Sequence, residues 1–164
     1  MILIAFTLFH VVLSLVGIGS GFVVVYGMLT SRRLDGWTAL FLATTAATSV
    51  TGYLFPVHRF TPGHPIGIVS LIVLALAIVG RYRFGLAGGW RGTYAVTAVA
   101  ALYLNVFVLI AQLFMKVPAL KAIAPTQSAP AFQIAQLCNL LLFLAIGVGA
   151  ARRFHGEPQA AAAR

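Results

Sequence analysis

Apolar residues run along this chain in long uninterrupted blocks, not in the alternating or one-faced patterns of soluble domains. Charged residues separate five charge-free blocks, residues 1–31, 36–58, 60–80, 92–115 and 122–151. Each block can hold a helix of about 20 residues, which at about 1.5 Å per residue crosses a bilayer core of about 30 Å. We therefore predict an all-α, polytopic integral membrane protein, a bundle of five transmembrane helices at residues 2–29, 37–55, 65–79, 93–114 and 131–151.

The third predicted helix is the shortest, since residues 65–79 make only about fifteen residues of a span that needs about twenty. It reaches full length if Tyr82 and Phe84 continue it. Arg81 and Arg83 would then extend their charged ends towards the membrane surface, as long basic side chains do. Whether this block crosses the membrane is the weakest part of the prediction.

Prolines and small residues mark the segments outside the helices. Pro118, Pro125 and Pro130 lie between the fourth and fifth helices and are too many for a continuous helix, so we expect an irregular cap there. Residues 156–164 are a run of small and polar residues, which predicts a short disordered cytoplasmic tail. The remaining residues, 1–155, form a single membrane domain.

The composition supports this assignment and excludes several classes of protein. Of 164 residues, 61% are hydrophobic and 8% charged, against about 25% charged in ordinary soluble domains. This excludes a soluble enzyme, a disordered chain and a disulfide-rich secreted scaffold, and the single cysteine, Cys138, lies in an apolar block where packing is its expected role. Basic residues exceed acidic ones by 11 to 2 but are scattered between apolar blocks, so we expect no nucleic-acid partner.

The distribution of basic residues predicts the orientation in the membrane. Five crossings divide the Lys and Arg residues into eight on one side and three on the other. Because positive charge gathers in cytoplasmic loops, we predict an outer N-terminus and a cytoplasmic C-terminus in the inner membrane of a bacterium. Without a third crossing the division would be seven to four, a weaker bias. The larger group is Arg32, Arg33, Arg81, Arg83, Arg91, Arg152, Arg153 and Arg164, and the smaller is Arg59, Lys116 and Lys121.

Histidines provide the first candidate site. His10 on the first predicted helix, and His58 and His64 before the third, all fall near the outer face when there are five crossings. Imidazole is a common ligand of metals and haem iron, so a copper ion or a b-type haem bound by these histidines is one hypothesis, with Arg59 beside a haem propionate. The pattern loosely resembles small helical membrane cytochromes, although no second histidine pair completes their two ligand sets. The alternative is that each histidine is structural.

Amides provide the second candidate site. They share one face of the fourth helix and one face of the fifth, at depths that predict a polar pocket near the outer side. The alternative is hydrogen bonding between helices, worth about 0.6–2 kcal/mol per contact in membranes. These residues are Asn105, Gln112, Gln133, Gln136 and Asn139.

Two small residues on the first helix, Gly17 and Gly21, form a Gly-x-x-x-Gly pair, which is typical of close helix packing. The pair lies in the middle of the span, outside the strand–loop–helix context of a nucleotide site. We therefore expect it to serve helix contacts, within the chain or in a homo-oligomer.

Both acidic residues, Asp35 and Glu157, fall in predicted cytoplasmic segments. Proton relays, cation-coupled transporters and membrane zinc hydrolases need such residues at membrane depth, so these classes are disfavoured. Three hypotheses remain: a binding or accessory subunit of a larger membrane complex, a haem- or metal-binding redox protein, and a carrier or pore for a small neutral or anionic solute. We expect binding more than catalysis, with the lipid bilayer as the surrounding partner.

Overall fold

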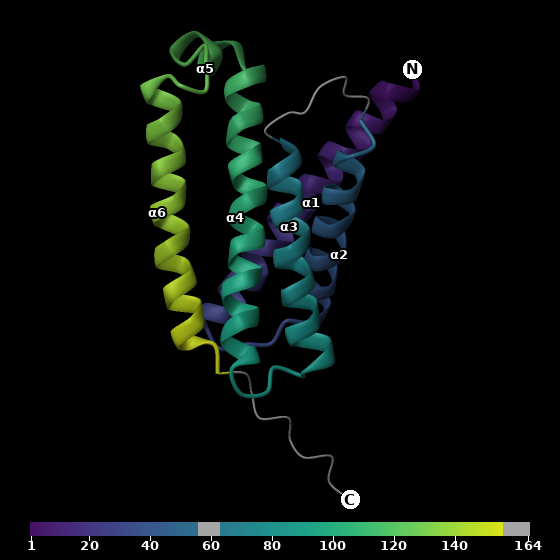
Figure 1. Cartoon of the computed structure of the whole chain (residues 1–164), viewed down its shortest axis with the longest axis vertical. Coiled ribbons are helices and arrows are strands. Elements are labelled where there is room, and N and C mark those ends of the chain that lie inside the picture. Colours follow the sequence, from purple (N-terminus) through teal and green to yellow (C-terminus); the bar gives the residue numbers. More distant parts are fainter. Residues whose placement is uncertain (56–62, 156–164) are drawn as a thin grey trace, which may run out of the picture.

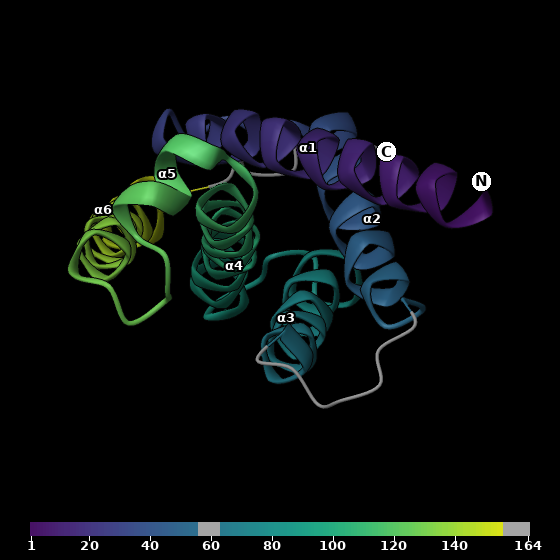
Figure 2. The same cartoon turned by 90° about the horizontal axis from the view of Figure 1, so that it is seen from above.

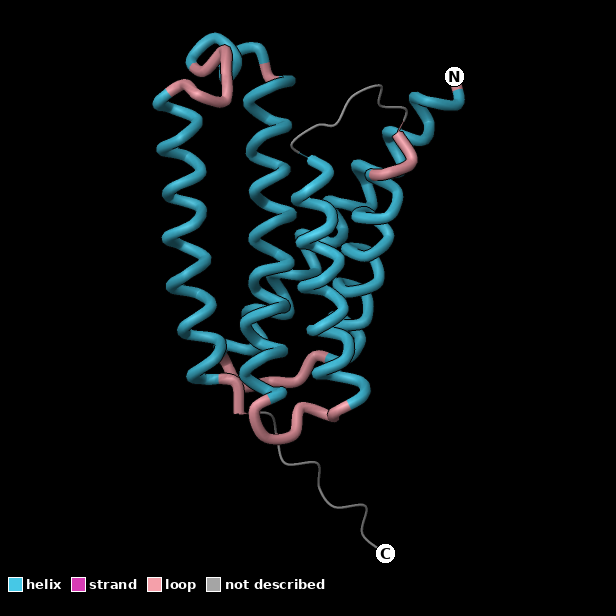
Figure 3. The backbone as a smooth tube through the Cα atoms, viewed as in Figure 1, coloured by secondary structure: helices cyan, strands magenta, loops and turns pink. Residues whose placement is uncertain are grey.

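The computed structural model describes residues 1–55 and 63–155, and this part of the chain consists of helices joined by short loops, without strands (Figure 3). The tail at residues 156–164 lies outside it. The elements in order are α1 (Ile2–Leu29), α2 (Asp35–Gly52), α3 (Gly63–Ile78), the π-helical turn η1 (Val79–Arg83), α4 (Trp90–Lys116), α5 (Pro118–Ile123) and α6 (Pro130–Arg153).

Helix α4 is the centre of the bundle. It lies between α3 and α6 and contacts both, and α1 crosses behind it with a strong tilt (Figures 1 and 2). Helix α2 packs on α1 and also contacts α3, so α1, α2, α3 and α4 form a closed ring of neighbours, with α6 attached at its side. The N-terminal half of α1 leans away from α4 at the end of the bundle where α5 lies, here called the α5 end (Figure 1).

Among the described residues, four helices are long and apolar enough to cross a membrane: Ile2–Leu29, Pro65–Arg83, Trp90–Lys116 and Pro130–Arg153. The chain is therefore an all-helical protein with the character of a multi-pass membrane protein. Helix α2 is not among the four because its sequence is rich in threonine. Thr38, Thr44, Thr45 and Thr48 are nevertheless all buried, so its polar side chains face the bundle and its exposed positions include Leu40 and Val50.

The short third helix is extended by η1. The π-helical turn carries the helix through Arg83, and Phe84 only caps it, so the candidate span Pro65–Arg83 has 19 residues. Arg81 does not extend to the surface as expected. Its side chain is only 4% exposed and forms an ion pair with Asp35, the first residue of α2. A π-helical turn contains more residues than an α-helical turn, so the side chains within it point in different directions from those of a continuous α-helix. Arg81 lies in this turn and is buried.

The packed core fills the half of the bundle opposite the α5 end, here called the basic end. Buried residues of α1 begin only at Gly17, and from there the helix packs on α2 and α4. A Cβ atom on Gly21 would lie 2.7 Å from Leu102 Cδ1 and 2.9 Å from Phe41 Cε2, so only glycine permits this approach. The helices converge at this point and diverge towards the α5 end.

The segment after α4 is more ordered than expected. In place of an entirely irregular cap, it contains the short helix α5, which Pro118 begins at its first turn. This position suits proline, since its missing N–H would have no helical acceptor there.

Candidate functional site

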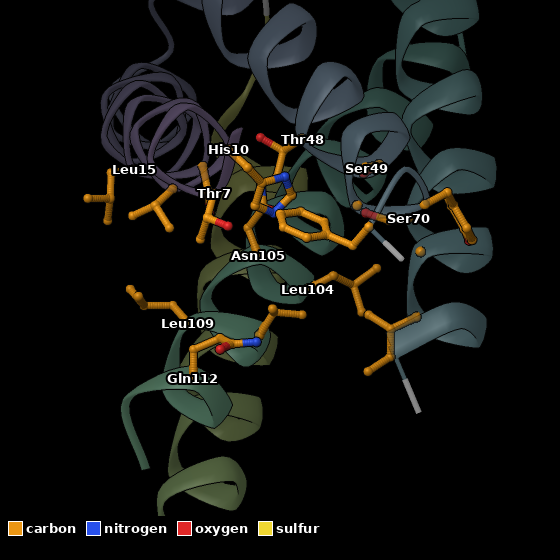
Figure 4. A pocket seen from close by; sticks show the side chains of 18 of the residues that line it. Thr7, His10, Leu15, Thr48, Ser49, Ser70, Leu104, Asn105, Leu109 and Gln112 are labelled. Carbon is orange, nitrogen blue, oxygen red and sulfur yellow. The ribbon is translucent and has the colours of Figure 1, made fainter. Parts of the chain in front are cut away.

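A cavity of about 540 Å³ occupies the space that the diverging helices leave at the α5 end (Figure 4). This lies within the range of about 300–1,000 Å³ that is usual for small-molecule sites. All four helices of the ring contribute to the walls, which are largely apolar with polar side chains among them. Polar side chains in the wall include those of His10, Ser14, Thr48, Ser70, Asn105 and Gln112.

His10 is held between α1 and α2. Its Nδ1 lies 2.8 Å from the hydroxyl of Thr51, and its ring meets the ring of Phe55 edge-on with centroids 5.1 Å apart. Phe55 also packs on Phe6, with ring centroids 4.9 Å apart, so the segment that follows α2 is fixed against the N-terminal half of α1. His10 is half-buried and lines the cavity. The other ring nitrogen, Nε2, makes no hydrogen bond to any residue that the structure describes.

Two amides of α4 line the same cavity. Asn105 is buried and donates from Nδ2 to the hydroxyl of Thr45, 3.2 Å away, which ties α4 to α2. Gln112 lies seven residues further on the same face, nearer the α5 end. Within residues 1–55 and 63–155, Gln112 has no hydrogen-bond partner, and Figure 4 shows its side chain at the cavity wall. Its amide is therefore free to bind a ligand.

Two hydroxyl groups complete the polar wall. Thr48 on α2 is buried, and its Oγ1 has no partner in the described part of the chain. Ser70 on α3 is only 4% exposed and likewise has no hydrogen bond to the described residues. Ordinarily such groups are paired, because an unpaired buried hydroxyl costs about 1–3 kcal/mol. Ser70 lines the cavity and suits an incoming ligand that would pair with it, whereas Oγ1 of Thr48 is covered by neighbouring atoms.

Lys116 stands at the mouth of the cavity, at the last turn of α4. Eleven residues separate it from Asn105, which places Asn105 about 16 Å deeper along the helix. Lys116 is the one charged side chain among the described residues of the wall, and no carboxylate is among them. The interior therefore offers neutral hydrogen-bonding groups, with a positive charge only at the entrance.

The proposed histidine cluster can be placed only in part. His58 and Arg59 lie outside the described residues, and His64 belongs to the first turn of α3 without a described side chain. In the part of the chain that the structure covers, no three His, Cys, Asp or Glu residues come close enough to hold a metal. His10 is thus found at the cavity, while its grouping with His58 and His64 remains a hypothesis.

The amides of α6 lie away from the cavity, in contrast to the single pocket expected. Gln136 is buried against α4, where its Nε2 donates to the carbonyl of Phe107 at 3.0 Å. Asn139 is buried in the same interface, and its Nδ2 finds no partner among the described residues. Gln133 is exposed. Helix α6 packs on the far side of α4, so a shared depth in the membrane does not bring the two amide faces together.

Gly17 and Gly21 also serve contacts within the chain. A Cβ atom on Gly17 would lie 3.2 Å from the hydroxyls of Thr44 and Thr45, and Gly21 faces α2 and α4 as described above. This face is covered, so it is not available for association between copies.

Sequence reasoning missed the pairing of Arg81 with Asp35. Arg81 also lies over the ring of Tyr94, with its Cζ 5.4 Å from the centroid, and Tyr94 in turn donates to Thr38 at 3.4 Å. The sequence feature that could have indicated this pair is Asp35 itself, because it is the acidic residue that lies beside a predicted span. These contacts close the basic end of the ring.

Comparisons with protein-family models, with curated proteins and with solved structures gave no match to this chain. The cavity is therefore the feature of the molecule that points to a function.

Proposed function

We propose that this chain is an integral membrane binding protein, whose ligand is a small, mostly apolar molecule with a neutral polar group. The observation that carries the proposal is the cavity of about 540 Å³ inside the ring of α1, α2, α3 and α4. Such a volume, lined by apolar side chains with a few polar groups, is the usual form of a ligand site. The free groups of Ser70 and Gln112 in its wall supply what such a ligand would need for its orientation.

We infer that all five long helices cross the membrane, with the α5 end outside and the basic end in the cytoplasm of a bacterial cell. The inward-facing threonines of α2 support its crossing, because they remove its polar groups from lipid. The basic residues support the orientation, since the described arginines stand at the basic end while Lys116 and Lys121 stand at the other.

Labelling of single cysteines tests this orientation. In a Cys138→Ser background, a membrane-impermeant maleimide applied to spheroplasts should label Leu54→Cys and Ala122→Cys, but Arg32→Cys only after permeabilisation. Labelling of Arg32→Cys and Leu54→Cys from the same side would show that α2 does not cross.

Native mass spectrometry of the protein in detergent-free membrane discs tests the binding proposal. We expect one defined non-protein mass on the natural chain. The variant Ser14→Phe would fill the cavity and should lose this mass, because Ser14 lines the wall. Val12→Phe is the matched control, since Val12 is 59% exposed on the same helix and is not part of the wall. The same unselective set of bilayer lipids on all three proteins would refute the proposal.

Three further measurements distinguish this proposal from the redox, carrier and accessory-subunit hypotheses. A Soret band, or one copper ion per chain, would favour the redox hypothesis over a binding protein. Solute flux in liposomes that Gln112→Leu abolishes would favour a carrier. Cross-linking of Lys121 to a second protein in native membranes would favour an accessory role in a larger complex, which is compatible with ligand binding.

A further inference from the structure

The contact between His10 and Thr51 determines which nitrogen of the imidazole carries the proton. The hydroxyl of Thr51 lies 2.7 Å from the carbonyl of Ala47 and 3.2 Å from that of Thr48, and it donates its single proton to them. The same oxygen lies 2.8 Å from Nδ1 of His10. Because its only proton is already donated, it can only accept a hydrogen bond from His10. Nδ1 is therefore the donor, and in the neutral ring the lone pair lies on Nε2.

The direction of the Thr51 hydroxyl comes from the helix and not from the histidine. Thr44, two turns earlier on α2, shows the same arrangement, with 2.7 Å to the carbonyl of Leu40 and 3.2 Å to that of Phe41. No imidazole bonds to Thr44 in the described structure. Donation to the preceding turn is the common state of threonine in a helix, so the acceptor role of Thr51 towards His10 does not need the ligand.

The cavity thus contains an acceptor without a partner. Nε2 of His10 has no hydrogen bond to the described residues, and His10 lines the wall. A ligand that satisfies Nε2 must present an O–H or N–H group. It must also be uncharged there, because no carboxylate is among the described residues of the wall and a charge at membrane depth is costly.

We propose that the ligand presents a hydroxyl group to His10 Nε2, which makes it a neutral hydroxylated amphiphile such as a long-chain phenol or alcohol. The hydroxyl of Ser70 is able to donate to the oxygen of the same group or to a second one. The apolar part occupies the remaining walls, which include Leu104 and Leu109 (Figure 4). This inference rests on the proposed binding function and adds to it the chemical class of the ligand.

Nitrogen-15 NMR of the natural protein in discs tests the histidine directly. The spectrum should show His10 with its proton on Nδ1 and an unprotonated Nε2, and the signal is assigned by its loss in His10→Phe. The other histidine signals should be unchanged in that variant, and a proton on Nε2 of His10 in the neutral ring would overturn the inference.

A matched pair of probes tests the ligand. 4-Decylphenol and its methyl ether share ring and chain, and only the phenol can donate a hydrogen bond. Because a neutral hydrogen bond is worth about 0.5–1.5 kcal/mol net, the phenol should bind about three- to tenfold more tightly than the ether. In His10→Phe this ratio should fall to about one, while Phe9→Leu, on the exposed face of α1, should keep it.

The outcomes separate the two proposals. If both probes bind saturably and equally to the natural protein, the hydroxyl inference is wrong and the binding function stands. If neither probe binds saturably, both are wrong.

Discussion

The approach of α1 to α2 and α4 at Gly21 makes a quantitative prediction for Gly21→Ala. The added Cβ would lie 2.7 Å from Leu102 Cδ1 and 2.9 Å from Phe41 Cε2. Neither neighbour has room to move, since Leu102 is fully buried and Phe41 is 1% exposed. Overpacking of this kind costs about 1–3 kcal/mol. Alanine also favours the helix over glycine by about 1 kcal/mol, so the net effect is smaller than the clash alone.

Gly19→Ala is the control that isolates the clash. Gly19 lies on the same helix with nothing within 4 Å of its added Cβ, so this variant gains the helix preference only. The free energy of unfolding of Gly21→Ala should therefore lie about 1–3 kcal/mol below that of Gly19→Ala. Unfolding by SDS in mixed micelles, followed by the fluorescence of Trp37 and Trp90, measures this difference. Equal midpoints for the two variants would show that α1 does not approach its neighbours as described.

Two further predictions concern buried polar groups. Asp35→Asn should lower the free energy of unfolding by about 1–3 kcal/mol, because it leaves the buried guanidinium of Arg81 without its carboxylate. Adding Arg81→Met should recover part of this loss in the same SDS titration, and an unchanged midpoint for Asp35→Asn would contradict the pairing. In the interface with α6, Gln136→Leu should cost about 0.6–2 kcal/mol through its lost bond to Phe107. Asn139→Leu removes an unpaired donor and should be neutral or stabilising, so a greater loss for Asn139 than for Gln136 would count against the contacts.

The helices themselves could be predicted from the sequence because lipid imposes one strong requirement, an apolar segment of sufficient length. The first helix has the predicted bounds, and the third gains the length it needed from a π-helical turn. Helix α2 shows the limit of this rule. Average hydropathy does not tell which side of a helix its threonines occupy, and those of α2 face the bundle.

The candidate site could be predicted only in part, because depth in the membrane follows from sequence while the neighbours of a helix do not. His10, Asn105 and Gln112 line one cavity as their depths suggest. Gln136 and Asn139 share that depth but lie in another interface, since α6 is adjacent to α4 and not part of the ring. The partner of Arg81 is far away in sequence, at the start of α2, and no local pattern points to it.

The closed basic end has a consequence for the cell. The ion pair of Arg81 and Asp35 and the stacking of Arg81 over Tyr94 lie at the basic end. On α4, the buried residues Ala98 and Leu102 lie between Tyr94 and the cavity residue Asn105. In the orientation proposed above, molecules could then enter and leave from the periplasm or the outer leaflet without opening a leak for protons or sodium. Such a protein can be abundant in an energised membrane without lowering the membrane potential.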